Sequence, residues 1–193
     1  MINPENAALL LMDFQAEIIE MTAGGGSRAA VEKAKVALAA ARTRGMPVIF
    51  VRVAYRLGHV DASARNKRVA MLRDQGRLVE GTAGASIVPE LAPRESEPVV
   101  VKRRVSALAH TDLQPLLSAL QIDTLVLCGL STSGVVLSTL RQAADADYRI
   151  VVLRDACADG DAEVHRVLTE KIFPAQATVM SVDEFTAGGK GAI

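Results

Sequence analysis

The sequence predicts an α/β fold: a Rossmann-like open parallel sheet of about six strands with helices on both faces. Two observations support this. Six short runs are almost continuously apolar and rich in Val, Ile and Leu, as strands buried on both faces are. Longer amphipathic stretches lie between most of these runs, and strands that alternate with helices form parallel sheets.

The six apolar runs are each too short for a typical helix and long enough for a strand. They are bounded by polar residues or by Gly and Pro, which commonly end strands. In chain order they are Ala7–Met12, Val48–Val53, Val99–Val101, Thr124–Leu127, Ile150–Leu153 and Ala177–Val182.

The helices are predicted from apolar residues at helical spacing and from their boundary residues. The first ends at Gly45, a natural helix stop, and the second follows Thr111, a candidate N-cap. The four stretches are Val31–Arg44, Asp112–Leu120, Ser133–Ala146 and Asp161–Lys171.

A long irregular segment, Tyr55–Pro98, interrupts the alternation after the second strand and is rich in Arg, Gly, Pro and Ala. Segments of this length in a compact domain are usually functional or poorly ordered. No internal repeat or second core is visible, so residues 1–193 are expected to form a single domain.

Composition excludes several classes of partner. The chain has 193 residues with 22 basic and 22 acidic side chains, and it has no Trp. A neutral chain without a basic stripe or stacking aromatics is not expected to bind nucleic acid or an anionic membrane. The N-terminus lacks a signal-peptide pattern, and no apolar run is long enough to span a membrane. We therefore expect a cytoplasmic protein whose partner is a small molecule.

The topology itself selects candidate site residues, because ligands of open α/β sheets bind beyond the carboxyl ends of the strands. The positions directly after the first five runs are Asp13, Tyr55, Lys102, the Gly129–Val135 segment and the Asp155–Asp159 loop. A carboxylate at a buried strand end requires a partner or a raised pKa. Asp13 and Lys102 are therefore predicted to pair, either as acid–base machinery or as a structural salt bridge.

The segment Gly129–Val136 joins the fourth run to a helix. Free backbone N–H groups and the helix dipole at such a junction can hold an oxyanion or a carboxylate. Alternatively, Ser131, Thr132 or Ser133 only caps the helix.

Taken together, these motifs resemble the isochorismatase-like hydrolases, a superfamily that includes nicotinamidases and other amide hydrolases. The resemblance spans nearly the whole chain. It is carried by Asp13 in LLMDFQ, by Lys102 in VVVKRRVSALAHTDL, and by the block LVLCGLSTSGVVLSTLRQAADADYRIVVLRDACAD. It implies that Asp13 and Lys102 are catalytic. It further implies a cis peptide before Ser131 and a substrate-binding or oxyanion site formed by Leu130, Ser131, Gly134 and Val135.

One position departs from the family pattern. The family's nucleophilic Cys lies six residues after the Gly, and the sixth residue after Gly129 is Val135. Valine has no nucleophilic group, so a thioester route is closed at this position. Cys128 falls inside the fourth strand and is expected to pack in the core. Cys157 is expected on the loop after the fifth strand, nearer the site.

Some members of the superfamily also lack the Cys, and among them the isochorismatases proper hydrolyse a vinyl ether. By resemblance, Asp13 would protonate the enol-ether carbon, and Lys102 would position Asp13 and bind an anionic substrate. The cations of the long segment that could assist are Arg56, Arg65, Lys67, Arg68, Arg73 and Arg77, most of which we expect to be solvated surface.

No metal or cofactor is expected. His59 and Asp61 alone form a poor metal site, and the first strand is not followed by a Gly-rich phosphate turn. His110 and His165 are expected to be surface or capping residues. The resemblance also implies a homodimer or homotetramer.

Two other functions remain open from the sequence. One is a metabolite-binding protein of the same fold without catalysis. The other is an amide hydrolase with a non-standard nucleophile, for which Ser131, Ser133 and Cys157 are the candidates.

Overall fold

The computed structural model describes residues 2–22, 24 and 26–188 and confirms the predicted fold class. Its six-stranded sheet has the order β3-β2-β1-β4-β5-β6, and every neighbouring pair is parallel. The strands are β1 (Ala7–Met12), β2 (Val48–Val53), β3 (Val99–Lys102), β4 (Thr124–Leu130), β5 (Arg149–Ala158) and β6 (Thr178–Met180).

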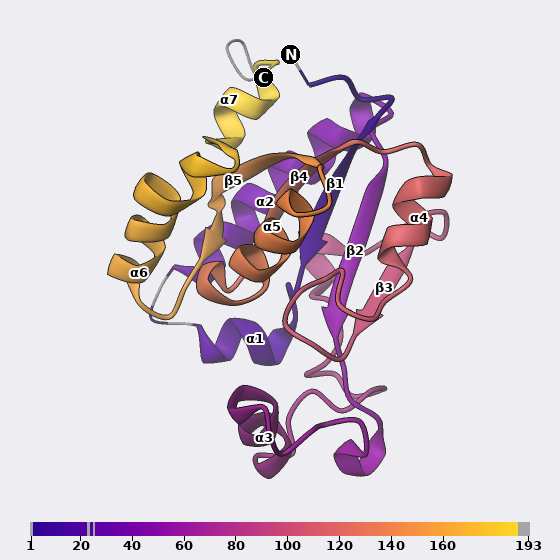
Figure 1. Cartoon of the computed structure of the whole chain (residues 1–193), viewed down its shortest axis with the longest axis vertical. Coiled ribbons are helices and arrows are strands. Elements are labelled where there is room, and N and C mark those ends of the chain that lie inside the picture. The colour runs from indigo at the N-terminus through magenta and orange to yellow at the C-terminus, as the bar shows by residue number, and fades with distance from the viewer. Residues whose placement is uncertain (1, 23, 25, 189–193) are drawn as a thin grey trace.

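Helices cover both faces of this sheet; α2 lies behind it in Figure 1 and α5 lies in front. The α-helices are α1 (Ala16–Met21), α2 (Ser27–Thr43), α3 (Lys67–Asp74), α4 (Leu113–Ala119), α5 (Leu137–Ala144), α6 (Ala162–Val167) and α7 (Val182–Thr186). Shorter helical turns are η2 (Leu57–His59), η3 (Pro89–Leu91), η4 (Thr132–Val136), η5 (Leu168–Ile172) and η6 (Phe173–Ala175). Within the described residues, no helix combines the length and apolarity that crossing a membrane requires.

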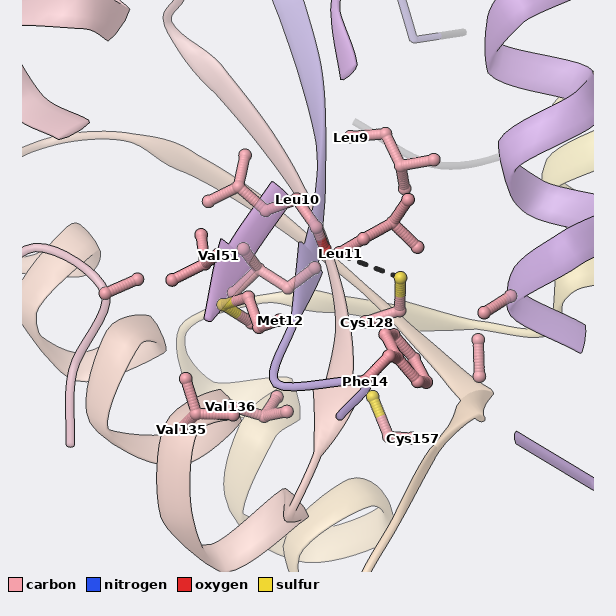
Figure 2. Close-up of a cluster of buried hydrophobic side chains, with 14 of the residues drawn as sticks. Leu9, Leu10, Leu11, Met12, Phe14, Val51, Cys128, Val135, Val136 and Cys157 are labelled. Atoms are coloured by element: carbon pink, nitrogen blue, oxygen red, sulfur yellow. Dashed lines mark hydrogen bonds between the residues drawn. The ribbon is translucent and has the colours of Figure 1, made fainter. Parts of the chain in front are cut away.

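The core is built on the two central strands. Every residue of β1 and of β4 is buried, which explains their uninterrupted apolar sequence. Figure 2 shows the alternation along β1: Leu9 and Leu11 point to one face of the sheet, and Leu10 and Met12 point to the other. Gly129 is required in β4, because a Cβ there would lie 2.5 Å from the Met12 carbonyl oxygen.

Several predicted boundaries change in the structure. The first long helix begins at Ser27, and it ends as expected before Gly45, whose φ is 67°. Asp112, not Thr111, occupies the N-cap of α4, although the Thr111 hydroxyl accepts a hydrogen bond from the Leu113 N–H at 3.3 Å.

The predicted helices Ser133–Ala146 and Asp161–Lys171 are each divided. The first starts as the π-helical turn η4 before α5, and the second passes from α6 into the π-helical turn η5. The fifth strand continues to Ala158, so the region from Asp155 to Ala158 is strand and was wrongly expected to be loop.

The long segment between β2 and β3 carries α3, which Figure 1 shows apart from the sheet, beyond the carboxyl ends of the strands. Polar contacts join this segment to α1 and to its N-cap residue, Gln15. The Glu17 carboxylate accepts the Leu78 N–H at 2.6 Å, and the buried Gln15 amide donates to the Ala85 carbonyl at 2.7 Å. The segment therefore forms a wall opposite the carboxyl ends of the strands. The site was predicted from the sequence at these strand ends.

Candidate active site

A small cavity of about 40 Å³ lies at the carboxyl ends of β1, β3 and β4. Its walls are mainly apolar, with Ile18 and Met21 from α1 and Val69 and Leu72 from α3 among them. The side chains of the cavity lining that carry a charge or a hydroxyl group are Asp13, Tyr55, Arg68, Lys102, Arg104 and Ser131. All six predicted site residues, Asp13, Lys102, Leu130, Ser131, Gly134 and Val135, line this one cavity.

Asp13 and Lys102 form a buried ion pair at the base of the cavity. Lys102 Nζ lies 2.8 Å from Asp13 Oδ2, and the two side chains are 3% and 5% exposed. Lys102 also donates to the Arg104 carbonyl oxygen at 3.2 Å. The second carboxylate oxygen, Asp13 Oδ1, is buried and has no hydrogen-bond partner among the described residues. A buried oxygen without a partner is costly, so this atom is available to a ligand or to water.

The backbone of Asp13 departs from the extended conformation of β1. Asp13 has a φ of 59°, and its N–H still donates to the Val51 carbonyl at 2.8 Å. Its own carbonyl accepts the Gln15 N–H at 2.8 Å. Left-handed backbone at a residue other than Gly is uncommon and often occurs at functional sites.

Burial raises the pKa of Asp13, because desolvation disfavours the charged carboxylate. The Lys102 ammonium and, more weakly, the Arg68 guanidinium act in the opposite direction and lower this pKa. The balance favours a carboxyl group that binds its proton more tightly than a surface Asp, as a general acid must.

The junction after β4 forms the wall beside this pair. The peptide bond between Leu130 and Ser131 is cis, as the resemblance implied. Gly134 packs against Ser131, since a Cβ at Gly134 would lie 2.7 Å from Ser131 Oγ. Val135 is 2% exposed and contributes its side chain to the cavity wall.

The junction is capped by a residue that sequence reasoning did not assign to it. Asp159 Oδ2 accepts the Ser133 N–H at 2.7 Å, whereas no Ser or Thr side chain caps η4. Thr132 Oγ1 lies 2.8 Å from His165 Nδ1. His165 is therefore a half-buried partner of the junction, which it contacts at the first residue of η4.

Neither cysteine belongs to the cavity. Figure 2 shows the Cys128 and Cys157 sulfur atoms on one side of the central strands and Val135 on the other. Cys128 Sγ lies 3.4 Å from the Leu10 carbonyl oxygen, and burial raises its pKa. Cys157 lies within β5, not on the expected loop, and burial raises its pKa to about 12. A buried thiol with a raised pKa holds little of the reactive thiolate at neutral pH, so neither cysteine is placed as a nucleophile.

The cations of the long segment differ in their surroundings. Arg56 pairs with Asp61, Arg73 with Asp74, and Arg77 with Glu20. Arg65, Lys67 and Arg68 are all exposed, and Arg68 is the member of this set that also lines the cavity.

Sequence reasoning missed Arg104, which lines the cavity two residues after Lys102. Its proximity to the end of the third strand was the available signal, since Arg104 lies two residues beyond Lys102, the last residue of β3. Sequence reasoning also gave Tyr55 no role, although it had selected this position because Tyr55 follows the carboxyl end of the second strand.

No group of three or more His, Cys, Asp or Glu side chains in the described parts of the chain is arranged to hold a metal ion. His59 Nε2 lies 2.8 Å from the Arg77 carbonyl oxygen, and Asp61 is engaged by Arg56 and Arg103. His110 is exposed, as expected.

Comparison with known proteins identifies the family. The isochorismatase domain model matches residues 7–184, nearly the whole chain. The chain belongs to the isochorismatase family. Its sequence is 32% identical over 193 residues to the uncharacterized isochorismatase family protein YecD of Escherichia coli O157:H7, covering 95% of this chain and 96% of that one.

Enzymes occur among the similar proteins. The chain is 33% identical over 162 residues to the maleamate amidohydrolase of Pseudomonas putida, covering 82% of this chain and 75% of that enzyme. A crystal structure of a cysteine hydrolase from Pseudomonas syringae pv. phaseolicola superimposes with a TM-score of 0.88 at 26% identity, covering 96% of this chain and 93% of the other. The relatives of this chain thus include enzymes named as amidohydrolases.

Proposed function

We propose that this chain is a hydrolase of small anionic molecules that uses Asp13 and Lys102 in Cys-independent acid–base chemistry of the vinyl-ether, C–O cleaving type. One observation carries the proposal: Val135 lines the cavity beside the Asp13–Lys102 pair, at the position where the family pattern has its nucleophilic Cys. The only two thiols of the chain are buried in β4 and β5. These positions support a reaction that uses the Asp13–Lys102 pair and no thiol.

The mechanism uses groups of this chain and water. Protonated Asp13 donates its proton to the terminal carbon of the enol ether, which forms an oxocarbenium ion and leaves Asp13 as a carboxylate. Water then adds to the cationic carbon, and Asp13 accepts a proton from it. The resulting hemiketal breaks its C–O bond to release an alcohol and a ketone. Asp13 ends protonated, so the cycle closes with one water consumed.

Lys102 has two effects in this scheme. Its ammonium orients the Asp13 carboxyl group through the 2.8 Å contact with Oδ2, which leaves Oδ1 directed to the reaction. It also stabilises the carboxylate that forms when the proton leaves. Burial acts against this stabilisation of the carboxylate, because it raises the pKa of Asp13. Asp13 therefore keeps its proton to a higher pH than an exposed Asp does.

An anionic substrate is supported by the charge of the cavity lining. Lys102, Arg68 and Arg104 supply positive charge against the single carboxylate of Asp13. The maleamate amidohydrolase relative is named for a substrate that carries a carboxylate.

Amide hydrolysis by a hydroxyl nucleophile is the second candidate, since similar enzymes are amidohydrolases. Ser131 lines the cavity, which makes it the hydroxyl to consider; Ser133 is exposed and lies outside the lining. A binding protein without turnover is the third candidate. It predicts that the ion pair only stabilises the fold.

Hydrolysis in D₂O separates these three functions. The substrates are a small vinyl ether, α-ethoxyacrylate, together with isochorismate and maleamate, and the products are followed by mass spectrometry. We expect α-ethoxyacrylate to give ethanol and pyruvate with one deuteron in the nascent methyl group. Maleamate turnover that Ser131→Ala abolishes would instead establish the amide hydrolase. Absence of turnover on every substrate would favour the binding protein.

A further inference from the structure

Two cations of the cavity have no acidic partner. Arg68, which is exposed, and Arg104, which is half-buried, both line the cavity, and no ion pair joins either of them to a carboxylate in the described parts of the chain. Arg104 donates only to backbone, to the Asp61 carbonyl at 3.2 Å and the Arg103 carbonyl at 2.7 Å. Their sequence neighbours differ: Arg103 pairs with Asp61 and Glu80, and Arg73 pairs with Asp74.

A hydroxyl donor lies in the same wall. Tyr55 is 1% exposed and lines the cavity, with its ring centroid 5.5 Å from that of His59. No hydrogen bond joins its hydroxyl to any described residue. Burial raises the pKa of Tyr55, and the positive charges of Arg104 and Arg68 lower it, so both guanidinium groups act on this hydroxyl.

The three groups come from separate parts of the fold. Tyr55 follows β2, Arg68 belongs to α3, and Arg104 follows β3. All three line one cavity, and the only acidic side chain of its lining, Asp13, is already paired with Lys102. Two unneutralised arginines beside a third cation repel one another, and this repulsion is relieved when an anion binds between them.

We propose that Arg68, Arg104 and Tyr55 form a carboxylate-binding subsite that selects short monocarboxylic acids and places the adjoining bond at Asp13. The guanidinium groups would each donate to the carboxylate oxygens, and the Tyr55 hydroxyl would donate a further hydrogen bond. The apolar side chains of the lining would contact the carbon chain. The claim that the bound carboxylate belongs to a substrate rests on the proposed function. The claim that the three residues bind a carboxylate does not depend on it.

The test measures binding without turnover. Crotonate and crotonamide have the same size and apolar body and differ in charge, so their ratio of dissociation constants reports recognition of the carboxylate. Titrations followed by NMR would compare the wild type with Arg68→Gln, Arg104→Gln and Tyr55→Phe. The matched controls are Arg73→Gln on α3 and Arg103→Gln beside Arg104, because both arginines already have acidic partners. Thermal unfolding checks that each variant is folded.

The wild type is expected to bind crotonate more tightly than crotonamide by roughly tenfold to a hundredfold, as charge-assisted hydrogen bonds imply. Arg68→Gln and Arg104→Gln should each remove most of this preference, Tyr55→Phe should reduce it, and the two controls should keep it. A wild type without the preference, or a preference that survives both arginine substitutions, overturns the subsite.

The two proposals fail differently. Discrimination between crotonate and crotonamide should persist in Asp13→Asn, since that variant removes the acid and leaves the subsite. If carboxylate binding is observed and α-ethoxyacrylate is not hydrolysed, the subsite stands and the proposed reaction is wrong. If α-ethoxyacrylate is hydrolysed equally well by Arg68→Gln and Arg104→Gln, the reaction stands and the subsite is wrong.

Discussion

Replacing Lys102 with Met should destabilise the protein by an amount that depends strongly on pH. The substitution keeps much of the aliphatic stem and removes the ammonium that lies 2.8 Å from Asp13. Both side chains are almost fully buried, so solvent cannot replace the lost partner. Asp13 then either remains as an unpaired buried carboxylate, at a cost of about 3–5 kcal/mol, or binds a proton.

The cost of protonation sets the pH dependence. An Asp in the unfolded chain titrates near about 3.9, and each pH unit above that value costs about 1.36 kcal/mol to keep the group protonated. The loss of stability should therefore reach about 1.5 kcal/mol near a pH of about 5. Near a pH of about 8 protonation would cost about 5.6 kcal/mol, so the loss approaches the full 3–5 kcal/mol of the unpaired charge.

The sign follows from the direction of the shift. Burial already raises the pKa of Asp13 above its ordinary value, and removing Lys102 removes the largest influence that lowers it. The folded variant therefore binds more protons than the unfolded chain across this window, and its stability falls as the pH rises from the ordinary Asp pKa towards the folded one.

Urea unfolding at both pH values measures this difference for the wild type and Lys102→Met. Lys33→Met is the control, because Lys33 forms partly exposed ion pairs with Asp155 and Asp183 that are worth little. The control should lose far less stability than Lys102→Met, and to a similar extent at both pH values, because solvent screens exposed ion pairs. A Lys102→Met loss that is the same at both pH values, or that is below about 1 kcal/mol near a pH of about 8, would refute the buried charge pair.

Three further predictions follow from the same structure. Iodoacetamide should not label the folded protein at Cys128 or Cys157, and mass spectrometry should find two labels after unfolding in urea; labelling of the folded protein at Cys157 would show that this thiol is accessible. Gln15→Leu should lower the free energy of unfolding in urea by about 1–3 kcal/mol, because the buried Val53 N–H loses its acceptor, whereas exposed Gln114→Leu should change it little. Hydrolysis should be unchanged after dialysis against EDTA, and loss of activity that added divalent metal restores would contradict the proposed mechanism.

The sheet could be predicted because its strands are buried on both faces. Burial on both faces leaves a continuous apolar run, as in β1 and β4, and such runs are visible without a structure. Because ligands of open α/β sheets bind beyond the carboxyl ends of the strands, Asp13 and Lys102 could then be selected by position alone. The junction after β4 was found by the same rule.

The long segment between β2 and β3 resisted prediction, because its residues are positioned by single polar contacts to distant parts of the chain. The Glu17 carboxylate accepts a hydrogen bond from the Leu78 N–H, and no local sequence pattern predicts that contact. The orientation of Arg68 therefore could not be separated from that of its neighbours. Cys157 was misplaced for a related reason: β5 continues past an irregularity in its pairing with β4, and the apolar run alone ends earlier.

The rate of α-ethoxyacrylate hydrolysis by the wild type and by Asp13→Asn tests the central claim most directly, with exposed Asp74→Asn as the control. A general acid contributes about 10²–10⁴-fold to a rate, so Asp13→Asn should lower kcat by at least about a hundredfold while Asp74→Asn leaves it unchanged. The wild-type rate should also survive iodoacetamide. Full activity in Asp13→Asn, or loss of activity on alkylation, would contradict Cys-independent catalysis by this acid.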